Sequence, residues 1–261
     1  MASAKISSDT GTLGKAISVL DVIASAPEPL RFRDLANQID QPRGTLHRQI
    51  SNLIEEGLLQ VNPDQSYSLG LRLLKFAAQS WSQNGLREIA EPHLRALHEL
   101  TGETVHLGVL QGTEVIYLDK VESRQAVRMH SQVGNSSPCY CTGVGKAGLS
   151  VLPRDEAEAR IAQINFHKFT ETTLTNAKAL LRELDEINRT GNAYDREEHE
   201  PGIHCVAAPV FTADRSITGG LSVTAPCYRI SQKQLESWAD DVRATAQAII
   251  ADLPVKMGPR A

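Results

Sequence analysis

The sequence predicts an α+β protein of two domains joined by one helix. Two observations support this class. The first part of the chain shows helical periodicity and ends in a short hairpin, whereas the rest combines strand patterns with helical ones. At 261 residues the chain is long enough to bury a hydrophobic core in each domain. We assign residues 10–70 to the first domain, 71–84 to the linker helix and 85–253 to the second domain.

Two helices are predicted at the start of the first domain. The first has one apolar stripe, formed by Leu13, Ala16, Ile17, Leu20 and Ile23. The second has the same kind of spacing, formed by Phe32, Leu35, Ala36 and Ile39. Pro27 and Pro29 close the first helix. Pro42 closes the second, because a proline pushes the residue before it out of helical geometry.

A third helix is predicted from Arg43 to Gly57. Its apolar stripe consists of Leu46, Ile50, Leu53 and Ile54. Its opposite face is polar and consists of Gly44, Thr45, Arg48, Ser51 and Asn52. The charges are segregated, since Arg43, His47 and Arg48 lie in the first half and two glutamates end the helix. This pattern is typical of a recognition helix whose first half enters a DNA major groove. The alternative is a surface helix packed on its neighbours.

The next segment predicts a wing. Two strand patterns, 58–61 and 66–69, flank the turn sequence Asn62-Pro63-Asp64-Gln65. Two helices across a tight turn, followed by this hairpin, form a winged helix-turn-helix, which predicts double-stranded operator DNA as a partner. Residues 1–84 hold eight Lys or Arg and eight Asp or Glu, so non-specific attraction to phosphates is expected to be weak. Specific binding then depends on where the charges lie and on two copies of the chain.

The linker helix is predicted to be unusually apolar. Leu71, Leu74, Ala78 and Trp81 share one side of it. Such a helix needs a second surface to cover it, and the same helix of a twofold mate would supply one. Packing on its own chain is an equally good interpretation. The sequence therefore predicts a homodimer without excluding that alternative.

The second domain is predicted element by element. It begins with a helix from Leu86 to Leu100, which Pro92 either kinks or divides. Strands are predicted at 104–110, 114–121, 125–130, 205–211 and 217–224. Further helices are predicted at 146–152, 154–163 and 176–190, and from the capping-box residue Ser231 to Ile249. Polar or acidic loops are expected at 131–138 and 194–202. Antiparallel strands flanked by helices indicate an α+β ligand-sensing domain.

Several segments together resemble a known family. They are PRGTLHR, SYSLGLRLL, TGETVHLGVL, VIYLDKVES, CTGVGKA, YDREEHEPGIHCVAAPVF and LSVTAP. In this order and spacing, the chain resembles bacterial transcription factors of the IclR (isocitrate lyase regulator) family over about residues 12–250. The resemblance implies a GAF/PAS-like sensing sheet, a homodimer or homotetramer, operator DNA as partner and a small organic acid as effector.

The resemblance also implies site residues. Thr45 and Arg48 match positions that touch DNA, and Arg33 lies near the phosphates. With the rest of the polar helix face, the predicted DNA-binding residues are Arg33, Arg43, Thr45, His47, Arg48 and Ser51. The predicted effector-binding residues are Met129, Gly143, Val144, Asp195, Ile203, Cys205, Ser222 and Thr224.

The chemistry of the second set suits a carboxylate effector. Gly143 and Gly145 let backbone N–H groups approach an anion at a helix start. Ser222 and Thr224 lie two apart on a strand, so both hydroxyls face one side. Asp195 could accept a hydrogen bond from a ligand hydroxyl.

This chain also departs from the family pattern. Gly44 replaces a usual serine, Asn135-Ser136 replaces two arginines, and His204 replaces another arginine. The last two departures remove cations. A sugar acid or hydroxy acid therefore suits the remaining polar set better than a strongly charged ligand.

Other motifs are weaker. Gly143 to Gly148 spells G-x-G-x-x-G, but no strand-helix-strand unit follows, so a dinucleotide site is not expected. Cys139, Cys141 and Cys205 with His204 leave a thiol- or metal-responsive regulator as the alternative function. Glu197-Glu198-His199 is interpreted as a solvated acidic loop, and Ser222 lacks a G-x-S-x-G context, so no enzyme is predicted.

The sequence also leads to expectations about cofactors, membrane contact and cellular location. No cofactor is predicted. The start of the chain is polar and no apolar run is long enough to cross a bilayer. We therefore expect a cytoplasmic protein without membrane contact.

Overall fold

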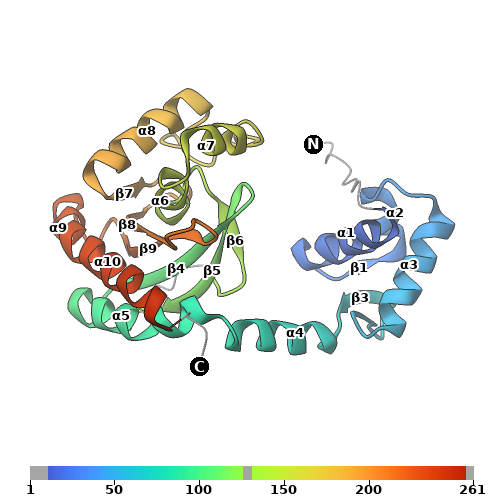
Figure 1. Ribbon diagram of the computed structural model, residues 1–261. Coiled ribbons are helices and arrows are strands. Elements are labelled where there is room, and N and C mark those ends of the chain that lie inside the picture. Colours follow the sequence, from blue (N-terminus) through green and yellow to red (C-terminus); the bar gives the residue numbers. More distant parts are fainter. Residues whose placement is uncertain (1–10, 126–130, 257–261) are drawn as a thin grey trace. The chain divides into compact units, whose positions relative to one another are not determined.

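A computed structural model describes residues 11–125 and 131–256 (Figure 1). The contacts within the chain divide it into two units, residues 1–83 and 84–261. The strand predicted at 125–130 falls almost wholly outside the described residues, as does Met129, and Gln125 itself lies in a bend. None of the described helices is both long enough and apolar enough to span a membrane.

Before the linker helix, the described part of the first unit consists of three helices and a small sheet. Its elements are α1 (Gly11–Ser25), β1 (Leu30–Arg31), α2 (Phe32–Gln38), α3 (Arg43–Glu55), β2 (Leu59–Val61) and β3 (Ser66–Leu69). The three helices and the hairpin agree with the sequence prediction. β1 was not predicted because two residues are too short for a periodic pattern. It pairs antiparallel with β3, which gives the strand order β1-β3-β2.

The apolar stripes of these helices form one core. Its most buried side chains include Val19, Leu35, Leu46, Ile50 and Leu59. Since the predicted stripe of α3 is turned into this core, the polar face of α3 is left outside.

The linker helix, α4, spans Leu71–Ser82. No residue of α4 is buried, and Leu71 and Leu74 are 74% and 66% exposed. Only Leu73 packs partly against the core of the first unit. The described part of the chain therefore leaves the apolar side of this helix uncovered.

The second unit is a six-stranded antiparallel sheet with helices on both faces. The strands are β4 (Thr104–Gln111), β5 (Glu114–Val121), β6 (Ser136–Pro138), β7 (Ala193–Arg196), β8 (Ile203–Phe211) and β9 (Thr218–Pro226). Their order is β6-β5-β4-β9-β8-β7. The helices are α5 (Gly85–Thr101), α6 (Gly143–Ser150), α7 (Arg154–Ile161), α8 (Ala177–Thr190), α9 (Gln232–Ser237) and α10 (Ala239–Lys256).

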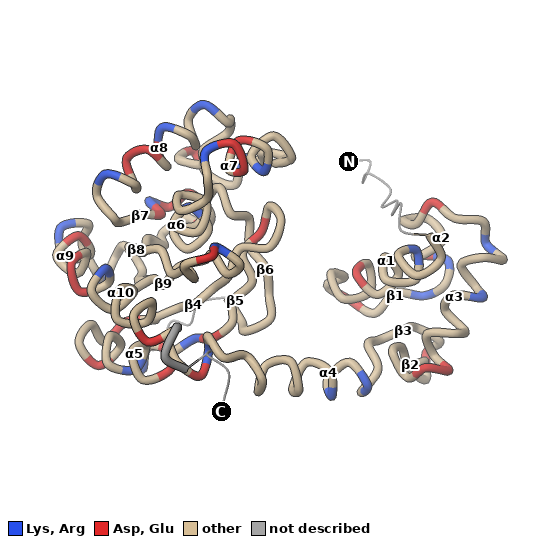
Figure 2. The backbone as a smooth tube through the Cα atoms, in the orientation of Figure 1, with Lys and Arg blue, Asp and Glu red and all other residues tan. Residues whose placement is uncertain are grey.

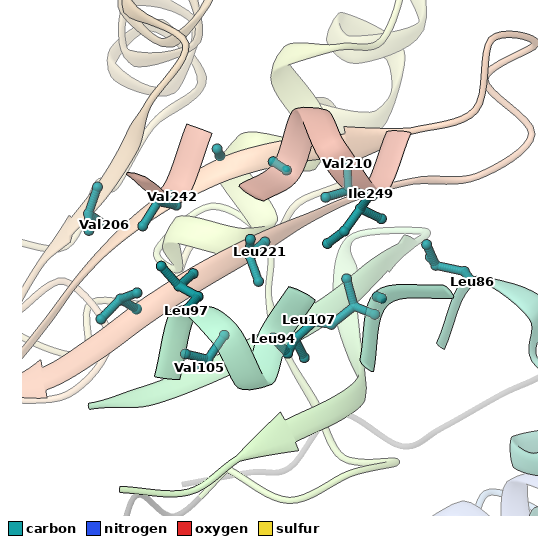
Figure 3. Close-up of a cluster of buried hydrophobic side chains, with 14 of the residues drawn as sticks. Leu86, Leu94, Leu97, Val105, Leu107, Val206, Val210, Leu221, Val242 and Ile249 are labelled. Carbon is teal, nitrogen blue, oxygen red and sulfur yellow. The ribbon is translucent and has the colours of Figure 1, made fainter. Parts of the chain in front are cut away.

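The two faces of the sheet differ. α5 and α10 cover one face and form an apolar core with it, which includes Leu94, Leu97, Leu107, Leu221 and Ile249 (Figure 3). α6 packs on the opposite face, and α7 and α8 lie beyond it (Figure 1). Successive side chains of a strand point to opposite faces. The neighbours of Leu107 and Leu221, His106 and Ser222, therefore point toward α6.

Three predicted features of this unit were wrong in detail. The loop expected at 131–138 contains β6, and the acidic loop expected at 194–202 begins with most of β7. Both are short edge strands that take their register from a neighbour rather than from a pattern of their own. The final helix is two, α9 and α10. Of the two alternatives at Pro92, the structure excludes a division, since α5 runs through this residue as one helix.

Candidate functional sites

The first candidate site is the exposed face of α3. Arg43, His47, Arg48 and Ser51 are exposed on it and Thr45 is half-buried, while Arg33 is exposed on α2. α3 begins after Pro42, whose side chain offers no cap to the first backbone N–H groups. Those N–H groups and the nearby arginines are the donors that phosphates and base edges require.

The arginines near this face have no ion-pair partner among the residues that the structure describes. None of Arg33, Arg43 and Arg48 forms an ion pair with any residue that the structure describes. Blue segments mark Lys and Arg along α3 in Figure 2. His47, in contrast, is held in place, because its ring packs edge-on at 5.8 Å from the ring of Phe32. The Ser51 hydroxyl donates to the His47 carbonyl at 3.0 Å.

One residue of α3 was not singled out by the sequence. Gln49 is 4% exposed, and neither its Oε1 nor its Nε2 has a hydrogen-bond partner among the described residues. A buried amide without partners costs stability. The i, i+3 spacing to Leu46 placed Gln49 on the apolar face but gave no hint of the missing partners.

The second candidate site is a cavity of about 240 Å³ between α6 and the sheet. It brings together seven predicted effector residues, namely Gly143, Val144, Asp195, Ile203, Cys205, Ser222 and Thr224. Met129, the eighth, lies outside the described residues. The sequence did not single out His106, Tyr117, Ser131, Ser137, Thr142 and Glu200, which also line the cavity.

The start of α6 forms one wall of the cavity. Thr142 caps it, since its hydroxyl accepts from the Gly145 N–H at 3.3 Å. A Cβ on Gly143 would lie 2.5 Å from the Cys205 sulfur, and one on Gly145 would lie 2.4 Å from the Cys139 Cα. The glycines of the G-x-G-x-x-G sequence thus serve close packing of α6. They bring its N-terminal backbone, with the positive end of the helix dipole, to the cavity.

The opposite wall carries hydroxyls and one imidazole. Ser222 Oγ and Thr224 Oγ1 of β9 lie 3.4 Å apart, and Thr224 Oγ1 lies 3.2 Å from His106 Nδ1 on β4. Burial, with a smaller effect from the charge of Lys120, lowers the pKa of His106 to about 3. His106 is therefore neutral at physiological pH. A histidine within the otherwise apolar run VHLGVL was the available signal for it.

Asp195 of β7 is the carboxylate of the cavity. It is 7% exposed, and its Oδ1 accepts from the Glu198 N–H at 2.7 Å. Burial, followed by the charge of Glu198, raises the pKa of Asp195 to about 7. Asp195 is thus an acceptor or a donor near neutral pH, according to its protonation.

The segment after Asp195 is not a solvated acidic loop, so that sequence interpretation was wrong for two of its residues. Glu198 is 5% exposed and accepts from Nζ of the fully buried Lys146 at 2.5 Å. The Thr173 hydroxyl donates to the Glu198 carbonyl at 2.6 Å, and His199 lines the cavity. A lysine 52 positions earlier in the chain provides the partner that sequence spacing could not show.

Two models of one protein family match this chain. A family model described as IclR helix-turn-helix domain matches residues 12–63, and one described as bacterial transcriptional regulator IclR C-terminal matches residues 78–251. The chain belongs to the IclR family. It is therefore a DNA-binding transcriptional regulator and not an enzyme.

Relatives of this IclR-family chain match it along its length. The transcriptional regulator KdgR of Escherichia coli is 29% identical over 97% of both chains. The acetate operon repressor of Salmonella typhimurium is 28% identical, over 95% of this chain and 92% of its own. Among solved structures, IclR of Thermotoga maritima is 30% identical, covers 93% of this chain and 98% of its own, and superposes with a TM-score of 0.68. The predicted family and fold class are confirmed.

Three of the four thiols of this IclR-family chain are poorly placed for sensing. Cys139, Cys141 and Cys205 are buried, and burial raises the pKa of Cys139 and Cys205 to about 12. A protonated thiol is a weak nucleophile and metal ligand. Within residues 11–125 and 131–256, no group of three or more His, Cys, Asp or Glu side chains is arranged to hold a metal ion.

Proposed function

We propose that this regulator is a repressor whose second domain binds one small hydroxylated monocarboxylate, such as a sugar acid or a hydroxy acid. The observation that carries the proposal is the cavity itself. It combines a helix start on one side with hydroxyls and Asp195 on the other. The name of the Salmonella relative supports the repressor role. A repressor acts at the chromosome, which places it in the cytoplasm.

The lining favours a ligand with one negative charge. The N-terminal backbone of α6 favours an anion, and the hydroxyls of Ser222 and Thr224 can donate to its oxygens. No Lys or Arg is among the described residues that line the cavity, whereas Asp195 and Glu200 both are. A second negative charge on the ligand would therefore lie near carboxylates without compensation. Hydroxyl groups on the ligand would instead donate to those carboxylates.

On the DNA side, we propose that Arg33, Arg43, Thr45, His47, Arg48 and Ser51 contact the operator. Five of these side chains are exposed, and the three arginines have no intramolecular ion pair among the described residues. Arg48 lies at the centre of the polar face of α3, which makes it the residue best placed to reach a base edge.

We further propose that the regulator binds as a homodimer or homotetramer through α4. The exposed Leu71, Leu74 and Trp81 would be covered by the same helix of a second chain. Because one DNA-binding domain is nearly neutral, the contacts that two copies make with the operator would together provide the affinity. The operator is then expected to be an inverted repeat whose half-sites lie about 10 bp apart, or a multiple of that. Footprints of one isolated half-site bound by a monomer would contradict this.

The effector proposal is tested by binding measurements on the whole protein. Glycolate, D-glycerate and D-gluconate are screened by thermal shift beside sorbitol, which lacks the carboxylate, and succinate, which has two. We expect at least one hydroxy acid to stabilise the protein by mass action, and sorbitol and succinate not to. Binding of none of the three acids would overturn the proposal.

Two variants then locate the site. Ser222→Ala should cost about 1–3 kcal/mol of affinity for the acid that binds, because a ligand oxygen loses its partner. Ser150→Ala is the matched control, since Ser150 is equally buried but bonds the Ala147 carbonyl at 2.8 Å and lies outside the cavity. Calorimetry that found both variants equal to the wild type would place the acid elsewhere.

A further inference from the structure

A row of hydrogen bonds crosses one wall of the cavity. It runs from Ser131 Oγ to His106 Nε2 at 2.7 Å, from His106 Nδ1 to Thr224 Oγ1 at 3.2 Å, and on to Ser222 Oγ at 3.4 Å. All four residues line the cavity. The row thus links the hydroxyls of β9 to the segment before β6 through a single imidazole.

His106 is well fixed within this row. It is 4% exposed, and its ring lies 5.2 Å from the ring of Tyr117. Its neighbour in the row is fixed as well, because Lys120 Nζ donates to the Ser131 carbonyl at 2.7 Å. The pKa of about 3 keeps the ring neutral at physiological pH. A neutral imidazole has one N–H donor and one acceptor nitrogen.

Two arrangements of the row follow. When Nδ1 carries the hydrogen, it donates to Thr224, and the Ser131 hydroxyl donates to Nε2. The hydroxyl hydrogen of Thr224 is then left for Ser222 Oγ or for a molecule in the cavity. When Nε2 carries the hydrogen, it donates to Ser131 and the Thr224 hydroxyl donates to Nδ1. Thr224 then offers the cavity only lone pairs.

We infer that His106 is a specificity-determining residue of the cavity, because its tautomer decides whether Thr224 donates to the bound molecule or accepts from it. A carboxylate oxygen only accepts. An acid held against Ser222 and Thr224 therefore selects the Nδ1–H form, and a ligand hydroxyl that donates there selects the Nε2–H form. The inference rests on the proposed function in that the acid occupies this cavity.

Two isosteric variants separate the two ring nitrogens. The side-chain amide of His106→Asn lies near the place of Nδ1 and can still donate to Thr224. The amide of His106→Gln lies near the place of Nε2 and can reach Ser131 instead. With glycolate, D-glycerate or D-gluconate as probe, we expect His106→Asn to bind within about threefold of wild type. We expect His106→Gln to lose at least about tenfold, which corresponds to about 1.4 kcal/mol.

His98→Gln is the matched control. His98 is also buried and its Nδ1 lies 2.8 Å from the Glu103 carbonyl, but it is on α5 and not in the cavity. Its substitution should leave acid affinity unchanged. Equal losses in His106→Asn and His106→Gln, or a loss in His98→Gln of the same size, would overturn the inference in favour of a merely structural role.

The tautomer is measured directly by the ¹⁵N chemical shifts of the imidazole in the full-length protein, free and with a probe acid bound. His106→Gln assigns the signal. Binding with His106 in the Nδ1–H form supports the inference. Binding with an Nε2–H ring or an imidazolium overturns it and leaves the proposed function standing. If none of the acids binds, the proposed function fails, and the inference fails with it.

Discussion

Replacing Asp195 by asparagine should remove a pH dependence from the stability of the second domain. Burial, followed by the charge of Glu198, raises the pKa of Asp195 from 3.8 to about 7. Between those values the unfolded carboxyl loses its proton while the folded one keeps it, so the free energy of unfolding falls as pH rises. At about 1.4 kcal/mol per pH unit, the fall amounts to about 4 kcal/mol. It is absent at low pH and complete above the folded pKa.

The assay uses a tryptophan in the right domain. The chain has two tryptophans, so a Trp81→Phe background leaves Trp238, at the end of α9, as the only one. Its fluorescence during urea unfolding at about pH 4.5 and about pH 7.5, with linear extrapolation to water, gives the two free energies. The Asp195→Asn protein should lose clearly less stability between the two pH values than the background protein does.

Asp214→Asn is the control for this experiment. Asp214 is exposed, and hydrogen bonds from the Thr212 and Ser216 hydroxyls lower its pKa to about 2. Its contribution to stability is lost only as pH falls through that lowered pKa, and it is already complete above the unfolded pKa. Between pH 4.5 and 7.5 the stability of Asp214→Asn should therefore change by as much as that of the background protein. Equal falls in the background and in Asp195→Asn would refute the reasoning about Asp195.

Three further predictions concern other parts of the chain. Arg48→Ala should weaken operator binding by about 1–3 kcal/mol and relax preference at one base position, as measured by fluorescence anisotropy, whereas unchanged affinity of the folded variant would exclude the contact. Gln49→Met should stabilise the first domain by about 1–3 kcal/mol in thermal unfolding, because the amide has no hydrogen-bond partner in the part of the chain that the structure describes, and destabilisation would contradict this. Iodoacetamide at neutral pH should leave operator affinity unchanged, since burial raises the pKa of Cys139 and Cys205 to about 12 and that of the half-buried Cys227 to about 11; loss of binding on alkylation would favour a thiol sensor.

The elements that could be predicted from the sequence are those with a strong period. α3 and α8 bury one stripe each, and the hairpin of β4 and β5 alternates, so their existence and approximate bounds were predictable. The short edge strands could not be predicted. β7 depends on pairing with β8, where Asp195 lies opposite Cys205, and that contact is not encoded in four residues alone.

The residues of the cavity likewise include some that could be predicted from the sequence and some that could not. The predicted effector residues came from resemblance to a family, and spacing alone justified only the shared side of Ser222 and Thr224. His106 was missed because it meets Ser222 through pairing of β4 with β9, more than a hundred residues apart in the chain. The burial of Glu198 was missed because its partner Lys146 lies on a different element.

The central claim is that acid binding in the cavity and operator binding by α3 are linked in one molecule. The most direct test is operator affinity with and without saturating concentrations of the acid that binds best among glycolate, D-glycerate and D-gluconate. Coupling free energies between two sites are typically about 1–3 kcal/mol, so we predict a change of at least about fivefold in the wild type. Ser222→Ala should need more acid to reach the same change. Operator affinity that is identical with and without the bound acid would contradict the claim.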